Sequence, residues 1–257
     1  MLETRRARPQ PPPKLCDRSL RAVVSHFLDD DDSVSDEFIP GLNEFSAQLE
    51  DVDFIITDLV VNVESQAPHQ KQIIDRDLIA STSCGAFESI DGDLFRATLK
   101  GQHLYFNSAN AVINRKVFDR YRFHSEIKKT ADWLFYLEVS LQERIKAIYF
   151  PNIFAVYNVH LSSMSIASDK SYWNMRAFEQ LHAVVPKGHP SHADVRRAYG
   201  KALFDAGYAD RLKHKPRALY YYCKSTRYGP PAANQGDPEI ARAGSALARR
   251  VKAADAT

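Results

Sequence analysis

Residues 27–32 read FLDDDD, and this short stretch sets the interpretation of the whole chain. The apolar residues before it are typical of a strand. The residues after it, from 35 to 49, recur at helical spacing, with Phe38, Leu42, Phe45 and Leu49 on one face. Because Pro40-Gly41 interrupts this stretch, we expect the regular helix to begin only there. A strand, an acidic loop and a helix in this order place carboxylates at a strand end, where open α/β sheets bind ligands.

The residues that follow alternate between strand and helix patterns. Residues 53–61 form a strongly β-prone run, and residues 64–82 are interpreted as a connection with a short helix. A helix is predicted over 131–144, capped by Thr130. Further strands are predicted at 104–106, 111–113, 147–150 and 153–159, the last two separated by Pro151-Asn152. Interspersed strands and helices favour an α/β fold.

The ends of the chain differ from this middle part. Residues 1–18 are rich in Arg and Pro and are predicted to be a disordered leader. After residue 168 the pattern becomes helical, with helices expected at 172–185, 191–206, 216–225 and 238–256. We therefore expect an α/β domain over 19–168 and a helical region over 169–257.

Composition excludes several classes of protein. Apolar residues make up 44% of the 257 residues, which is enough for a packed core. The formal net charge of +2 gives no sign of a nucleic-acid partner. The three cysteines are far apart and have no zinc-type spacing. No apolar run approaches the length of a membrane span, and reduced thiols are typical of a cytoplasmic protein.

The acidic loop is a candidate metal site. Hard divalent cations prefer oxygen ligands, and adjacent carboxylates repel one another unless a cation neutralises them. A solvated acidic turn before a helix explains the same residues equally well. Residues 30–34, DDDSV, also fit the DxDx[TV] pattern of aspartate-nucleophile phosphatases, but no partner loop is found for that chemistry.

Two further residues are candidates for chemistry. Asp132 lies in the first turn of the helix at 131–144, either as a partner of the helix dipole or as a general base for a hydroxyl. His160 follows the strand at 153–159, and a neutral imidazole there is either structural or a ligand for a Mn²⁺-like ion.

In this order the motifs resemble those of the family 2 glycosyltransferases, over roughly residues 20–165. The loop FLDDDD matches that family's "flDxDD" motif. Residues 107–115, NSANAVINR, lead to FHSE at 123–126 and TADW at 130–133, which resemble its "FdE…ED" element. Residues 157–165, YNVHLSSMS, resemble its "yR.H..S.S" segment.

The resemblance implies an incomplete GT-A (Rossmann-like) fold and a metal-dependent, inverting sugar transfer. A nucleotide-sugar donor and a glycan or lipid-linked acceptor would be the substrates, with Mg²⁺ or Mn²⁺ as the cofactor. The implied metal ligands are Asp29, Asp31, Asp32 and His160, and the implied base is Asp132. The implied donor- and acceptor-binding residues are Asp30, Ser108, Asn110 and Trp133.

The chain departs from the family pattern in two places. The family's "ED" pair is Ala131-Asp132 here, so the acidic neighbour of the base is replaced. The family's first strands, which bind the nucleobase, would precede residue 20, where only the Pro-rich leader stands. The alternative interpretation is therefore an inactive glycosyltransferase remnant that acts as a binding or interaction module.

The helical region carries many basic residues, with Tyr220 to Tyr222 among them. Lipid-linked acceptors reside in membranes, and basic residues are attracted to anionic lipids. These residues would therefore contact the inner face of the plasma membrane. A solvated basic face on a packing appendage is the interpretation that the pattern favours.

Overall fold

The structure is a computed structural model that describes residues 24–44, 51–64, 66–77, 79–100, 108–141, 145–160 and 169–228. The leader at 1–18, the strand predicted at 104–106 and the helix predicted at 238–256 lie outside these residues.

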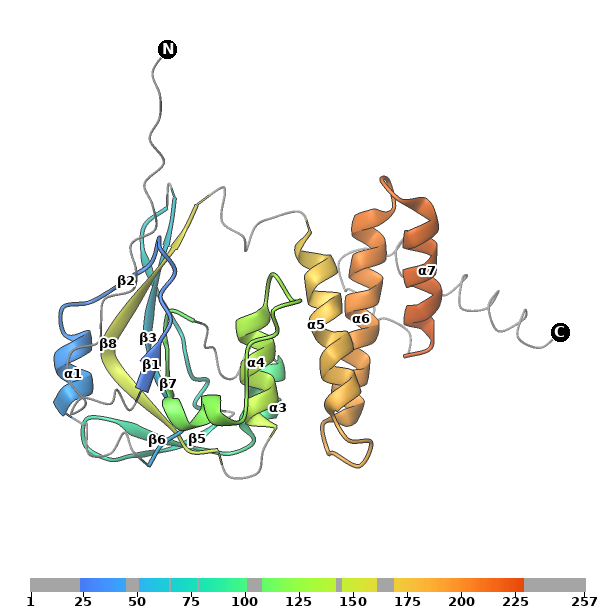
Figure 1. The fold of residues 1–257 in the computed structure, drawn as a ribbon. Helices are drawn as coiled ribbons and strands as arrows, with labels where there is room; N and C mark the ends of the chain where they lie inside the picture. The colour runs from blue at the N-terminus through green and yellow to red at the C-terminus, as the bar shows by residue number, and fades with distance from the viewer. Residues whose placement is uncertain are drawn as a thin grey trace, which may run out of the picture.

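An eight-stranded mixed sheet forms the centre of the α/β part (Figure 1). Its main path runs β1-β7-β3-β8-β6-β5, while β2 pairs with β8 and β4 pairs with β3. Every pairing is antiparallel except that of β3 with β8. The strands are β1 (Val24–His26), β2 (Ser33–Val34), β3 (Phe54–Val63), β4 (His69–Lys71), β5 (Ala80–Ser83), β6 (Glu88–Asp91), β7 (Ala111–Asn114) and β8 (Ala147–Val159).

The parallel pair β3–β8 is the longest ladder in the sheet, and it contains a bulge. The register runs from Phe54 opposite Ala147 to Val63 opposite Val159, and it shifts between Thr57 and Asp58. The two strands predicted at 147–150 and 153–159 are therefore one strand, which corrects the sequence interpretation. Pro151 lacks an N–H group and lies where the ladder is already interrupted, so it bends the strand without ending it.

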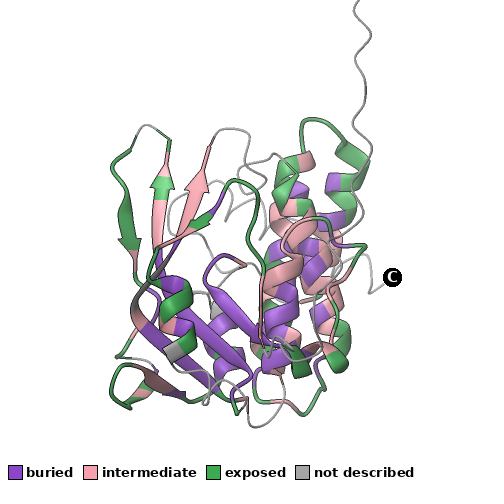
Figure 2. Ribbon diagram, turned by 60° about the vertical axis from the view of Figure 1, so that its left-hand side comes forward, coloured by how far each residue is buried: buried purple, intermediate pink, exposed green. Residues whose placement is uncertain are grey.

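Helices cover both faces of the sheet. Helix α1 (Phe38–Glu44) packs on one face through Phe38 and Leu42. Helices α3 (Leu94–Lys100) and α4 (Ala131–Ser140) lie on the other face, where a larger apolar cluster forms between them and the strands. The central strands are accordingly the most buried part of the sheet, whereas its outer hairpins are exposed (Figure 2).

Three long helices follow the sheet: α5 (Lys170–Val184), α6 (His192–Asp210) and α7 (Lys215–Thr226). They stack side by side beyond α4 (Figure 1). Helix α5 packs on α4 through Ala177 and Leu181 against Leu134 and Leu137. Gly207 lets α7 approach α6 closely, because a Cβ atom there would lie 3.1 Å from the Ala218 carbonyl oxygen. The helical region is thus joined to the sheet through a continuous apolar layer.

The region at 64–82 differs from its prediction. It contains no helix among its described residues and instead forms β4 and β5. Strand β4 has no apolar alternation, and it exists because its backbone pairs with the outer end of β3, from Leu59 to Val61. Pairing of this kind leaves no pattern in the side chains.

Two helix starts also differ. Helix α1 begins at Phe38 rather than at Pro40-Gly41, because a proline in the first turn needs no N–H group. Thr130 precedes α4 with a φ of 62°, and its side chain makes no capping hydrogen bond, so the predicted Thr130 cap is wrong. Left-handed backbone at a threonine is strained and points the side chain away from the helix N–H groups.

The structure confirms a mixed sheet of strands with flanking helices, followed by the helices α5 to α7. The GT-A (Rossmann-like) part of the fold prediction stays a prediction. Six α-helices and one short 3-10 helix, η1 (Arg115–Asp119), occur in the described residues. None of the helices described is both long and apolar enough to cross a bilayer.

A histidine beside two glutamates makes the stability of this fold depend on pH. His124 contacts Glu138 of α4 through Nε2 (2.8 Å) and Glu126 through Nδ1 (3.1 Å). Burial by itself lowers the pKa of His124, but the hydrogen bonds to Glu138 and Glu126 outweigh it and raise that pKa above 6.5. The contribution to stability is therefore complete below the unfolded pKa and is lost as pH rises through the raised folded pKa.

We expect His124→Gln to reduce the free energy of unfolding by about 1–2 kcal/mol near about pH 6 and by little near about pH 9. Denaturant unfolding at both pH values measures this difference. The matched control is His69→Gln, at an exposed position in β4. An equal loss at both pH values for His124→Gln would contradict the assignment.

Candidate functional site

The acidic loop connects β1 to β2 and folds back on itself. The Asp32 backbone N–H donates to the Asp29 carbonyl oxygen at 3.1 Å, which closes a tight turn. Phe27 anchors the loop on one side, since its ring contacts the rings of Phe118 and Phe123 at centroid distances of 5.7 and 5.2 Å. The hydrogen-bonded turn and the aromatic contacts of Phe27 therefore hold the acidic loop in place.

The end of β8 holds the other side of this loop. The Asn158 backbone N–H donates to Asp32 Oδ1 at 2.9 Å, and its side-chain Nδ2 donates to the Asp31 carbonyl oxygen at 2.6 Å. Asn62 of β3 in turn donates to Asn158 Oδ1 at 2.7 Å. Two adjacent strands thus fix the loop through one asparagine.

This arrangement gathers three carboxylates into a small volume. Asp29, Asp31 and Asp32 each offer one oxygen, and these oxygens lie within 4.8 Å of one another. His160 joins them, because its Nε2 lies 2.8 Å from Asp31 Oδ2. The structure therefore brings together all four residues that were predicted as metal ligands.

Two carboxylates of the loop, Asp29 and Asp32, have raised pKa values. Burial raises the pKa of Asp32 to about 6, against the hydrogen bond from Asn158, and the charges of Asp31 and Asp29 add to this. Burial likewise raises the pKa of Asp29, followed by the charges of Asp31, Asp132 and Asp30. The charge of Asp132 on α4 thus acts on Asp29 of the acidic loop.

Asp132 is held by backbone groups. Burial raises its pKa, while backbone N–H groups of Trp133 and Ser108 donate to it and lower that pKa in part. Tyr136 lies one turn further along α4, is fully buried, and experiences the charges of both Asp132 and Asp29. The charges of Asp132 and Asp29 therefore both act on the Tyr136 hydroxyl and raise its pKa further, after burial.

The predicted donor and acceptor residues differ in their surroundings. Asp30 is exposed beside the cluster. Ser108 contributes its backbone to Asp132. Trp133 packs edge to face on Phe178 of α5, with ring centroids 5.0 Å apart. Asn110 has no exposed surface, and its Nδ2 donates to the Thr57 carbonyl oxygen at 3.1 Å, so it ties β7 to β3 and offers nothing to an acceptor.

The donor set fits a hard divalent cation. Carboxylate oxygens and one imidazole suit Mg²⁺ or Mn²⁺. Oxygens on opposite sides of one Mg²⁺ lie about 4.2 Å apart, so the loop needs little movement to bind it. Asp32 Oδ2 is buried and accepts no hydrogen bond among the described residues, and a cation would satisfy it.

Asn158 was not predicted as a functional residue. The sequence held one signal, a polar side chain between Tyr157 and Val159 near the end of an apolar strand. Its bond to the Asp31 carbonyl depends on the pairing of β2 with β8, which no local pattern reveals.

No protein-family model and no curated protein sequence matches this chain. The family resemblance described above therefore depends on the quoted motifs and stays a prediction.

We expect Asn158→Ala to weaken Mn²⁺ binding about 10–100-fold, because removing a group that orients metal ligands typically has this effect. Titration of the protein with Mn²⁺ in a calorimeter measures it. Asn174→Ala on α5 removes an amide away from the loop and serves as the control. Equal affinities of the Asn158→Ala variant and the native chain would show that this asparagine does not shape the site.

Proposed function

We propose that the chain is a metal-dependent glycosyltransferase of the family 2 type. It moves a sugar from a nucleoside diphosphate donor to a hydroxyl of a glycan or lipid-linked acceptor, with inversion. The observation that supports this is the cluster of Asp29, Asp31 and Asp32 with His160 beside it and the charge of Asp132 acting on it. The alternative, a solvated acidic turn, explains neither the contact of His160 with Asp31 nor the burial of Asp132.

The residues divide the chemistry between them. Asp29, Asp31, Asp32 and His160 hold the cation, which would stabilise charge on the leaving diphosphate. Asp132 takes the proton of the acceptor hydroxyl. The hydroxyl oxygen then bonds to the anomeric carbon from the face opposite the leaving group, and the bond from that carbon to the diphosphate oxygen breaks.

The surroundings of Asp132 suit a general base. A carboxylate with an ordinary pKa is a weak base at neutral pH, and the raised pKa of Asp132 brings it closer to the working range. Backbone N–H groups donate to it and fix its orientation, and because they do not ionise near neutral pH, the carboxylate stays able to accept the proton of the acceptor hydroxyl.

We expect the native chain to bind UDP or GDP in the presence of Mn²⁺ and to lose this binding in EDTA. Asp31→Asn lowers the affinity at least about tenfold, since it removes a ligand charge and the partner of His160. Asp36→Asn, an exposed residue beyond the loop, is the matched control.

Asp132→Asn separates binding from catalysis. We expect it to leave Mn²⁺-dependent nucleotide binding unchanged and to slow transfer from a nucleotide sugar about 10²–10⁴-fold. Calorimetry and a product assay measure the two effects. Absence of Mn²⁺-dependent nucleotide binding by the native chain would reject the transferase and favour a non-catalytic remnant.

For the lipid-linked acceptor we propose a peripheral contact with the inner face of the plasma membrane. The observation that favours it is the turn between α6 and α7, where Leu212 is 81% exposed and is flanked by Arg211, Lys213, His214 and Lys215. An apolar tip within a basic segment suits an anionic lipid surface, where each cation contributes about 1 kcal/mol.

We expect the chain to sediment with vesicles that contain phosphatidylserine and not with vesicles of phosphatidylcholine alone. Leu212→Ser reduces the bound fraction, because it removes the apolar tip. Val184→Ser, at an exposed residue of α5, is the control and leaves binding unchanged. Equal binding to both vesicle types would exclude the electrostatic contact.

A further inference from the structure

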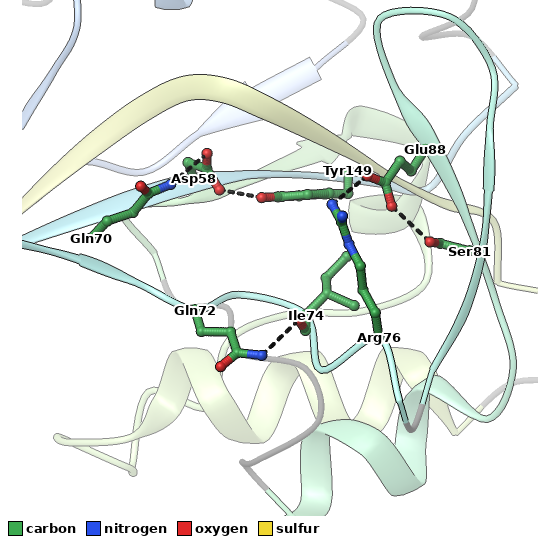
Figure 3. A network of polar contacts seen from close by, with 8 residues as sticks. All are labelled: Asp58, Gln70, Gln72, Ile74, Arg76, Ser81, Glu88 and Tyr149. Atoms are coloured by element: carbon green, nitrogen blue, oxygen red, sulfur yellow. Dashed lines mark hydrogen bonds and ion pairs between the residues drawn. The ribbon is translucent and has the colours of Figure 1, made fainter.

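A pocket of about 490 Å³ is lined by residues of β3, β4 and β8 and by the segment at 72–77, none of which belongs to the acidic loop. Its volume is within the range of roughly 300–1,000 Å³ that small-molecule sites occupy. Figure 3 shows its side chains, which come from β3, β4, β8 and the segment at 72–77. The lining residues that matter for the argument are Asp58, Gln70, Lys71, Gln72, Arg76 and Tyr149.

Asp58 forms the inner end of the pocket. It is the first residue of β3 after the register shift of the β3–β8 ladder, and it is only 3% exposed. The Tyr149 hydroxyl of β8 donates to Asp58 Oδ1, and Gln70 Nε2 of β4 donates to Asp58 Oδ2 at 2.9 Å. A buried carboxylate is costly unless it is hydrogen-bonded, so these two donors keep a polar group at the bottom of a cavity.

These two donors also face the pocket as acceptors. The Tyr149 hydroxyl donates its O–H hydrogen bond to Asp58 and so has its oxygen lone pairs left for a ligand, and Gln70 offers Oε1. Figure 3 shows both side chains directed toward Asp58 along one wall. Acceptors in fixed positions beside a buried carboxylate are what a hydroxylated ligand needs.

The opposite wall supplies donors. Arg76 is paired with Glu88 of β6 at 2.5 Å, and Glu88 also accepts from Ser81 of β5 at 2.7 Å. The β5–β6 hairpin thus holds the guanidinium in place, and a guanidinium has more N–H groups than this one ion pair uses. Gln72 is exposed at this side and donates to the Ile74 carbonyl oxygen at 3.3 Å.

The charges exclude most small ligands. The lining contains three carboxylates, at Asp58, Asp75 and Asp77, against two cations, at Lys71 and Arg76. The carboxylates disfavour an anion, and the two cations disfavour a metal ion. Ile73, Ile74 and the Tyr149 ring add apolar surface between the polar groups.

We propose that this pocket binds a neutral saccharide unit. Alternating hydroxyl and C–H groups match a lining in which donors, acceptors and apolar faces are interleaved. The site is separate from the proposed transfer reaction, because none of its lining residues belongs to the acidic loop, α4 or His160. Sugar binding in this pocket is therefore tested independently of Mn²⁺ and nucleotide binding.

The experiment follows amide resonances of the native chain while neutral sugars are added at millimolar concentrations. The probes are glucose, galactose, N-acetylglucosamine and maltose, with inorganic phosphate and Mn²⁺ as charged comparisons. We expect at least one sugar to shift the amides of residues 58, 70–77 and 149, without Mn²⁺ and with no effect of UDP.

Two variants test the pocket itself. Tyr149→Phe keeps the ring and removes the hydroxyl, which raises the Kd for that sugar about tenfold. Gln72→Trp fills the cavity from an exposed position and so leaves Asp58 undisturbed. Tyr220→Phe, on the exposed face of α7, is the matched control and keeps the native Kd.

Three results would overturn the proposal. These are an absence of shifts at the pocket amides with every sugar, shifts there with phosphate or Mn²⁺ alone, and native affinity in both the Tyr149→Phe and Gln72→Trp variants. Loss of Mn²⁺-dependent nucleotide binding with sugar binding intact would reject the transferase and leave this site standing.

Discussion

The parallel pairing of β3 with β8 is the constraint on which the rest of the structure depends. It joins residues about 90 positions apart in the sequence and is the longest ladder in the sheet. Antiparallel partners then add on both sides, through β7 and β1 next to β3 and through β6 and β5 next to β8. The outer end of the same pair carries β4 and β2. A parallel pair usually requires cover on both faces, which α1 on one side and α3 with α4 on the other provide.

Both candidate sites are consequences of this pair. The acidic loop is fastened to the end of β8 by Asn158, and Asn62 of β3 holds that asparagine from the neighbouring strand. The pocket begins where the ladder shifts register, and there the Tyr149 hydroxyl donates to Asp58. Bulges recur next to functional sites because they redirect a side chain without ending the strand. One pair of strands therefore fixes carboxylates in two unlike settings, one crowded with like charge and one enclosed by neutral donors.

The sequence predicted the parts of this protein that depend on local pattern. Residues 53–61 and 111–113 are β-prone runs, and helical patterns follow residue 168. The structure contains β3, β7, α5, α6 and α7 there, with small shifts of their ends. The acidic loop could be predicted because four consecutive acids are chemically conspicuous, and its proximity to His160 followed from the family resemblance. Residues 69–71 could not be predicted as a strand, because backbone pairing alone makes them one.

The pocket was missed for a related reason. Asp58 stands in the middle of an apolar strand, which is a signal in itself, since buried carboxylates need partners. Its partners Tyr149 and Gln70 come from distant strands, and no spacing in the sequence connects them. Thr130 shows the opposite error. Its residue type is that of a helix cap, but the chain reaches it with a positive φ, which only the path of the preceding segment determines.

The fastening of the acidic loop by Asn158 has a consequence for how folding itself can be followed. Strand residues alternate sides of a sheet. If β8 slid by one position relative to β2, Tyr157 or Val159 would take the place of Asn158, and the His160 imidazole would move away from Asp31. A chain with this register error could then be compact and helical and still lack the arrangement of the acidic loop that the proposed metal site requires. The cation binding proposed for this loop would then report, during refolding, when β8 and β2 reach their native register.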